Sequence, residues 1–307
     1  MQLPAMASWA WIPIVVAAAL AQTIRNATQR TLVSSLGTLP ATLVRFLYGL
    51  PFAGAWLATV TWLTGGPAGV PAFGLAYAAW LIFGAGAQLA ATACLLVAVK
   101  QRNFIVGVTL SKTEVLQVGL FATFFLHEIP TLYSVVAMVI ATVGVVLLSL
   151  PKKAEAGAAY WRGNAAWYGL ASGAFFALSS VAYRGASLQL PGVSPWLIGA
   201  WGVLLAQLLQ TLLLGGWLAL RVPGTVTAVA RAWRLSLLAG MMGAMASVGW
   251  MTAVSMRPAV DVRTLGLLEV LFSYLVSRQL FRERTSRNEM LGLILVAAGV
   301  LVVCAQL

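Results

Sequence analysis

Long apolar stretches of about twenty residues alternate along the chain with short groups of glycine, proline and charged residues. A helix of about 20 apolar residues spans the roughly 30 Å hydrocarbon core of a bilayer. The pattern predicts ten such helices, at residues 9–30, 40–63, 73–99, 103–126, 131–150, 163–188, 194–219, 233–255, 259–280 and 287–306. The stretches are too continuous for barrel strands, in which apolar and polar residues alternate. We therefore expect an all-α integral membrane protein with ten transmembrane helices.

The second half of the chain repeats the first at an offset of 155 residues. The sequence T-L-S-K-T-E-V-L begins at Thr109, and T-L-G-L-L-E-V-L begins at Thr264. The same offset relates residue types that are rare in this chain: Pro40 and Pro195, Trp62 and Trp217, Arg102 and Arg257, Glu114 and Glu269. Because each copy holds five predicted spans, the second copy inserts upside down, an arrangement typical of secondary transporters. We expect two inverted five-helix repeats, at 1–150 and 163–307, joined by a loop at 151–162.

The composition supports a membrane protein and explains the net charge. Of the 307 residues, 61% are hydrophobic and 8% are charged, and the mean hydropathy is +0.92. An ordinary soluble domain is about 25% charged, so this chain cannot cover a water-facing surface. We interpret the net charge of +12 as topology signals on short loops and not as a surface for nucleic acid.

The basic residues are distributed unevenly between the two sets of loops. Thirteen follow predicted spans 1, 3, 5, 7 and 9, and three, Arg184, Arg257 and Arg263, are assigned to the other side. Basic loops favour the cytoplasmic side of a membrane. We therefore predict that both termini lie outside, in a protein of the bacterial cytoplasmic (inner) membrane.

The two copies of the glutamate motif resemble the EamA-type half of the drug/metabolite transporter superfamily. The first copy, E-V-L-Q-V-G-L-F-A-T-F-F-L-H-E, starts at Glu114, and the second, E-V-L-F-S-Y-L-V-S-R-Q-L-F-R-E, starts at Glu269. Gly-Val-rich final spans follow, V-G-V-V-L-L-S and A-G-V-L-V-V-C. Family members commonly show E-P where this chain has E-V, so the resemblance implies that spans 4 and 9 are straighter than usual. It also implies transport of small metabolites, which in this superfamily include amino acids, nucleotide sugars and drugs.

Glu114 and Glu269 are the central candidates for binding substrate or protons. Each lies about ten residues into its predicted span, close to the middle of the bilayer, where charged residues are costly and usually functional. A glutamate there can exchange protons or attract a cation. The alternative is that both form hydrogen bonds that only pack helices together. Lys112 has Leu267 as its repeat partner, and it either binds an anionic substrate group or forms a structural salt bridge.

Predicted span 1 carries a polar stripe. Gln22, Arg25, Asn26 and Gln29 are spaced so that they share one helix face. In lipid such a face must turn toward protein or a watery cavity, although the end of a helix can also reach the interface. Arg25 is a candidate partner for Glu114 or for a substrate carboxylate.

Further polar and aromatic residues complete the predicted lining of the site. Ser111 and Gln117, three residues to either side of Glu114, are expected on its helix face. The remaining members of the set are Gln88, Tyr183, Trp250 and Tyr274. Individually, such residues often serve as hydrogen-bonding groups between helices.

These features predict a secondary transporter that exports a small metabolite, with an amino-acid-like zwitterion favoured, by alternating access and with protons as the coupling ion. The alternatives left open are an organic-cation or drug–proton antiporter, an uncoupled facilitator, a channel or a lipid scramblase. No nucleophile elbow, metal-ligand cluster or Walker A motif occurs in the sequence. We therefore predict no enzyme activity, no metal and no cofactor. The expected partners are a small-molecule substrate, protons and the lipid bilayer.

Overall fold

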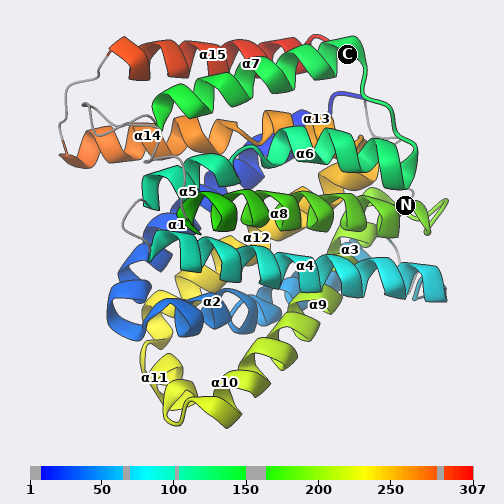
Figure 1. Ribbon diagram of the computed structural model, residues 1–307. Helices are drawn as coiled ribbons and strands as arrows, with labels where there is room; N and C mark the ends of the chain where they lie inside the picture. Colours follow the sequence, from blue (N-terminus) through cyan, green and yellow to red (C-terminus); the bar gives the residue numbers. More distant parts are fainter. Residues whose placement is uncertain (1–7, 65–69, 101–103, 150–163, 282–286, 307) are drawn as a thin grey trace. The chain divides into compact units, whose positions relative to one another are not determined.

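A computed structural model describes residues 8–64, 70–100, 104–149, 164–281 and 287–306 (Figure 1). It is 86% helix, and no strand occurs among the described residues. Six helices are long and apolar enough to cross a membrane: Thr38–Leu63, Leu75–Ala98, Asn164–Leu188, Pro195–Arg221, Trp233–Met256 and Arg287–Cys304. These findings confirm the prediction of an all-α membrane protein. Ten spans and an inverted repeat stay predictions.

Helix occupies each of the ten ranges predicted to span the membrane. The helices of the first half are α1 (Trp11–Leu36), α2 (Thr38–Leu47), α3 (Leu50–Leu63), α4 (Leu75–Val99), α5 (Phe104–Ser111), α6 (Glu114–Phe121), the π-helix η1 (Ala122–Leu126) and α7 (Leu132–Leu148). Those of the second half are α8 (Asn164–Leu188), α9 (Pro195–Gln210), the π-helix η2 (Thr211–Gly215), α10 (Gly216–Arg221), α11 (Thr225–Arg231), α12 (Trp233–Met256), α13 (Ala259–Leu265), α14 (Leu268–Phe281) and α15 (Arg287–Cys304). The predicted loop at 151–162 lies outside the described residues.

Four predicted spans are not among the six helices long and apolar enough to cross a membrane, and the reason differs between them. Helix α1 has 26 residues, but its polar stripe lowers its hydropathy. Helix α7 is apolar but has only 17 residues. Predicted spans 4 and 9 are each divided into shorter helices by a turn.

Turns interrupt spans 4 and 9, so neither span is one continuous helix. Helix α5 ends at Ser111 and α6 begins at Glu114, while α13 ends at Leu265 and α14 begins at Leu268. In the first turn the N–H groups of Lys112 and Thr113 donate to carbonyls three residues back, at 3.1 Å each. Hydrogen bonds of that kind wind the chain more tightly than an α-helix. The backbone therefore breaks both spans although valine, not proline, follows each glutamate.

The first residues of corresponding helices in the two halves are separated by the same 155 residues as the sequence repeat. Helices α5 and α13 begin at Phe104 and Ala259, and α7 and α15 begin at Leu132 and Arg287. Both pairs differ by 155 residues (259 − 104 and 287 − 132). The turns in spans 4 and 9 fall at corresponding places in the two halves, so the repetition extends from residue identity to backbone conformation.

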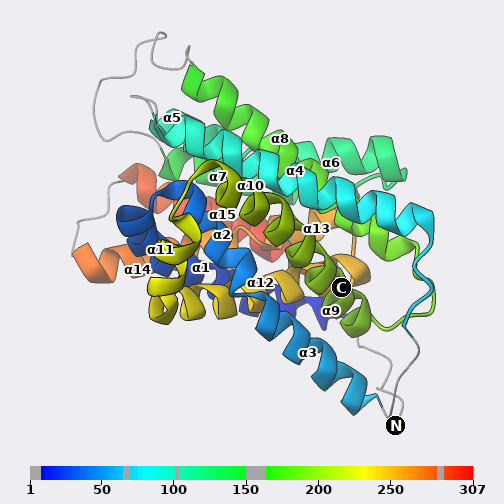
Figure 2. The same cartoon turned by 90° about the horizontal axis from the view of Figure 1, so that it is seen from below.

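The chain forms two compact units, each built from segments of both predicted repeats. Unit 1 comprises residues 1–85 and 183–257, and unit 2 comprises residues 86–182 and 258–307. The division falls inside α4 and α8. In unit 1, α1 lies along α12 (Figure 2), and a Cβ on Gly249 would lie 2.7 Å from the Cβ of Ala18. Close approach of this kind requires small residues at the contact.

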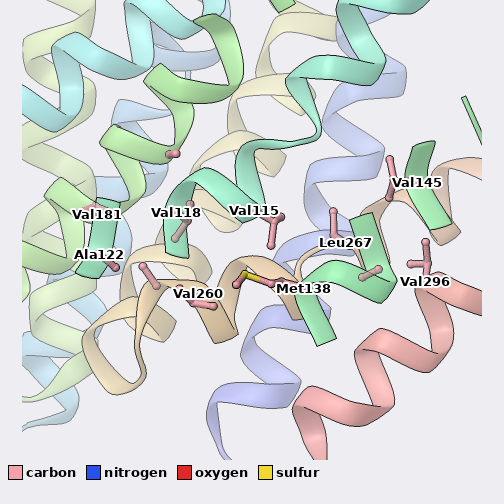
Figure 3. Packing of buried hydrophobic residues seen from close by; sticks show 12 residues of the cluster. Val115, Val118, Ala122, Met138, Val145, Val181, Val260, Leu267 and Val296 are labelled. Carbon is pink, nitrogen blue, oxygen red and sulfur yellow. The ribbon is translucent and has the colours of Figure 1, made fainter. Parts of the chain in front are cut away.

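Unit 2 has its own apolar core, in which α7 packs against α15. A Cβ on Gly144 of α7 would lie 2.7 Å from the carbonyl oxygen of Gly292 on α15. Val115 and Val118 of α6, Met138 of α7 and Val260 of α13 meet in the same core (Figure 3). This packing holds the turn between α5 and α6 beside α13.

Candidate substrate and coupling site

Glu114 lies at the turn between α5 and α6 and forms an ion pair with Arg263 of α13. Nη2 of Arg263 donates to Oε1 of Glu114. The two side chains are 20% and 11% exposed, Arg263 and Glu114 respectively, so the pair is largely removed from solvent. Charges buried in this way need a partner. Arg263 lies in α13, so the prediction that it belongs to a loop as a topology signal is wrong.

Glu269, the repeat partner of Glu114, also acts on Arg263. Its charge interacts with the Arg263 guanidinium. Glu114 is the first residue of α6 and Glu269 lies in the first turn of α14. The first turn of a helix carries unsatisfied N–H groups and the positive end of the helix dipole, which favour a carboxylate. Two helix starts and one arginine therefore form a charged cluster within unit 2.

The turn beside Glu114 is covered closely by Gly173 of α8. A Cβ at this position would lie 3.0 Å from the Ser111 carbonyl oxygen, 3.1 Å from Gln117 Nε2 and 3.4 Å from the Glu114 nitrogen. Gln117 Nε2 donates to Thr113 Oγ1 at 3.0 Å. Ser111 and Gln117 therefore lie on either side of the turn at Glu114 and not on one continuous helix, because α5 ends at Ser111.

A second polar cluster surrounds Asp261, two residues before Arg263 on α13. Ser134 Oγ donates to Asp261 Oδ1 at 2.6 Å. Thr131 Oγ1 lies 2.9 Å from Ser134 Oγ and donates to Gln306 Oε1 at 2.7 Å. Asp261 is 7% exposed, and the hydroxyl contact offsets part of the cost of burying its carboxylate. Sequence interpretation did not single out this residue.

Part of the polar stripe on α1 turns toward protein within unit 1: Arg25 is buried and Gln22 and Gln29 are half-buried, whereas Asn26 is exposed. Trp250 Nε1 of α12 donates to Gln22 Oε1 at 3.0 Å. Arg25 donates from Nε and Nη2 to Asn26 Oδ1, at 3.2 and 2.7 Å. Arg25 is 6% exposed, so the alternative that it reaches the interface does not apply. Gln29 Nε2 donates to the Ala41 carbonyl at 3.0 Å.

The other predicted site residues lie on several helices in both units. Lys112 is half-buried in the turn before Glu114. Gln88 lies on the part of α4 that belongs to unit 2, and Tyr274 lies on α14. Tyr183, in unit 1, packs against a core that contains Ile198. The predicted set is thus divided between the units: five members in unit 1 (Gln22, Arg25, Asn26, Tyr183, Trp250) and seven in unit 2 (Gln88, Ser111, Lys112, Glu114, Gln117, Glu269, Tyr274).

Arg263 and Asp261 were missed although a signal was present in the sequence. Both lie inside range 259–280, which was predicted to span the membrane. An ionisable residue within a span is by default a functional candidate. Arg184, also assigned to a loop, lies in α8 and donates to the Val254 carbonyl at 2.9 Å. Charge counts for topology therefore included residues that serve the interior of the protein.

Comparison with known proteins shows the fold and no function. No group of three or more His, Cys, Asp or Glu residues suited to a metal occurs in the described part of the chain. Neither a protein-family model nor a curated protein matches the sequence. One solved crystal structure, described only as that of a protein, matches with a TM-score of 0.68 and 16% identity, over 95% of each chain. At this identity the match shows a shared fold alone.

Proposed function

We propose that this protein is a secondary transporter that moves a small metabolite by alternating access, with Glu114, Arg263 and Glu269 as its coupling site. The pair of broken spans carries the proposal. Broken helices are tolerated at membrane depth where they are buried in protein or line a cavity. In secondary transporters they commonly supply the sites for substrate and ions. Here each break is followed at once by a helix start that carries a glutamate.

The proposal includes membership of the EamA-type branch of the drug/metabolite transporter superfamily. Two glutamate motifs, ten helical ranges and helix bounds that repeat at 155 residues support it. The proposed architecture is ten spans in two inverted repeats, placed in a bacterial inner membrane with both termini outside. The fold shared over 95% of a solved chain is compatible with this architecture and says nothing of the substrate.

Competition for charged groups couples substrate to protons in the proposed mechanism. A proton added to Glu114 neutralises its carboxylate and removes the ion pair, while the charge of Glu269 still acts on Arg263. Arg263 can then bind a substrate carboxylate by donating hydrogen bonds from its planar guanidinium group. The ammonium group of the substrate and the proton compete for Glu114, so binding of the ammonium group releases the proton. A zwitterion such as an amino acid satisfies both charges.

An organic cation is the second candidate substrate, because the cluster carries two carboxylates and one guanidinium. Its formal charge of −1 attracts a cation even when Arg263 binds nothing else. The two substrates make different demands on Arg263. A zwitterion requires the guanidinium for its carboxylate, whereas an organic cation requires only a glutamate.

Flux measurements in proteoliposomes test the proposal. The panel contains labelled L-amino acids and the organic cation ethidium, each measured with and without an imposed pH gradient. Wild type is compared with Glu114→Gln, Glu269→Gln and Arg263→Gln, and with Glu289→Gln as the control. Glu289 lies in the first turn of α15, outside the charged cluster, and its loss should leave gradient-driven flux unchanged.

The expected result is saturable flux driven by the gradient and lost in the Glu114 or Glu269 variant, while exchange of substrate for substrate survives. If Arg263→Gln loses amino-acid flux but retains ethidium flux, the zwitterion depends on the guanidinium group and the organic cation only on a glutamate. Gradient-independent flux with normal activity in both glutamate variants would make the glutamates structural. A steady ohmic current would indicate a channel instead of a transporter.

A further inference from the structure

A short segment joins two of the helices that are long and apolar enough to cross a membrane. The candidate spans Pro195–Arg221 and Trp233–Met256 leave only residues 222–232 between them. This connection holds α11, a helix of 7 residues and therefore about 10 Å long, far too short to cross the hydrocarbon core. The chain reverses direction here, between α10 and α12 (Figure 1). If both helices cross the membrane, as their length indicates, the segment lies at its surface.

Helix α11 is fixed to the rest of unit 1 through one face. Thr225 and Val229 are 5% and 1% exposed, and residues four apart share a helix face. Tyr48, between α2 and α3, donates from its hydroxyl to the Val229 carbonyl at 3.2 Å. Val226, on another face, is 52% exposed. The segment thus has a defined orientation, with a buried side and an outward side.

The exposed surface of this region carries three arginines and two tryptophans. Arg221, Arg231 and Arg234 are all exposed, and the guanidinium carbon of Arg234 lies 5.5 Å from the centre of the Trp233 ring. Trp233 and Trp217 are half-exposed. Arginine and tryptophan side chains of this kind are typical of the membrane–water interface. Residues 195–256 contain no Asp, Glu or Lys, so residues 221–234, which we call the basic segment, have a formal charge of +3.

We propose that the basic segment binds the headgroup of an anionic phospholipid through Arg221, Arg231 and Arg234. Guanidinium groups donate paired hydrogen bonds to phosphate oxygens, and basic residues beside a membrane surface attract anionic lipids. Apolar side chains are exposed in the same region, among them Leu220 at 84% and Val226, and these can contact acyl chains. A soluble phosphate would meet only the arginines, so the combination favours a lipid. The proposal depends neither on transport nor on which side of the membrane faces the cytoplasm.

Thermal unfolding of the purified full-length protein in mixed micelles tests the lipid site. Dioleoyl phosphatidylglycerol is titrated against dioleoyl phosphatidylcholine at constant total lipid, on wild type and on Arg221→Gln, Arg231→Gln and Arg234→Gln. We expect phosphatidylglycerol to raise the melting temperature of wild type with a saturable dependence on its mole fraction. The apparent affinity should fall about five-fold in each variant, since one basic residue near an anionic surface contributes a factor of about that size. A double variant of Arg231 and Arg234 should lose about ten-fold or more.

Matched controls separate this site from surface charge in general. Arg30 is an exposed arginine of α1 in the same unit, and Arg30→Gln should bind phosphatidylglycerol as wild type does. Arg231→Lys keeps the charge and should retain most of the affinity, which a purely structural role of the guanidinium group would not predict. Trp233→Leu removes the ring beside Arg234 and should weaken binding, whereas Trp62→Leu, at an exposed tryptophan of α3, should not. Because all of these side chains are exposed, each variant should fold.

Three results would overturn the proposal. The first is equal stabilisation of wild type by phosphatidylglycerol and phosphatidylcholine, and the second is the same loss of affinity in Arg30→Gln as in Arg231→Gln. The third is full stabilisation by inorganic phosphate without lipid, which would assign the arginines to a soluble anion. Stabilisation by phosphatidylglycerol in a protein that shows no flux would leave the lipid site intact and count only against the proposed transporter.

Discussion

Arg263→Gln should lower the free energy of unfolding more than Glu114→Gln does, although the two residues form one ion pair. In Arg263→Gln, the carboxylates of Glu114 and Glu269 stay at their helix starts with their shared cation gone. In Glu114→Gln, Arg263 retains its interaction with Glu269, and the new amide can still accept a hydrogen bond. The asymmetry follows from one arginine serving two glutamates.

Burial sets the size of the two effects. The side chains of Arg263 and Glu114 are 20% and 11% exposed, so solvent screens the pair only weakly. Loss of one partner from a buried pair costs about 3–5 kcal/mol, because the other charge is left uncompensated. We expect Arg263→Gln to fall in that range. Glu114→Gln should cost about 1.5–3 kcal/mol, the range for one hydrogen bond to a charged group.

A double-mutant cycle measures this difference directly. Unfolding free energies are obtained from SDS titrations in mixed micelles, followed by circular dichroism, for wild type, both single variants and the double variant. The coupling energy should exceed the roughly 0.5 kcal/mol within which independent sites add. Glu289→Gln is the control and should not couple to Arg263→Gln. Equal costs for the two single variants, or additivity in the cycle, would refute the reasoning.

Three further substitutions test the packing that supports the site. Gly173→Ala places a carbon 3.0 Å from the nearest backbone oxygen of the turn between α5 and α6, and should lower transport rates in proteoliposomes; wild-type rates would contradict this. Gly144→Ala brings a carbon within 2.7 Å of backbone atoms of α15, and should cost about 1–3 kcal/mol in the SDS titration, whereas Gly86→Ala, with open space around it, should cost little. Trp250→Phe removes the hydrogen bond to Gln22 and should cost about 0.5–1.5 kcal/mol, a loss that should vanish in a Gln22→Leu background.

Hydrophobic length was enough to predict where helices lie but not where they break. Helix occupies most of the described part of every predicted range, because a backbone in lipid must satisfy its own hydrogen bonds. The turn at Lys112 and Thr113 contains neither glycine nor proline. It follows from tighter local hydrogen bonding and from the close fit of Gly173, and neither can be recognised from spacing along one helix.

The sequence predicts the two glutamates of the charged cluster but not its arginine. Glu114 and Glu269 were found from the internal repeat, because glutamate is rare in this chain and recurs at 155 residues. Arg263 has no such signal, since its repeat partner is Val108. Only packing of α13 against α6 brings Arg263 to Glu114.

Measurement of proton movement that accompanies substrate is the sharpest test of proton coupling at Glu114. Proteoliposomes loaded with the pH dye pyranine receive the substrate identified in the flux panel, with no imposed gradient. We expect a substrate-dependent change of internal pH in wild type and none in Glu114→Gln, while substrate exchange persists in both. An equal pH change in the two proteins would contradict a coupling role for Glu114 and its ion pair with Arg263.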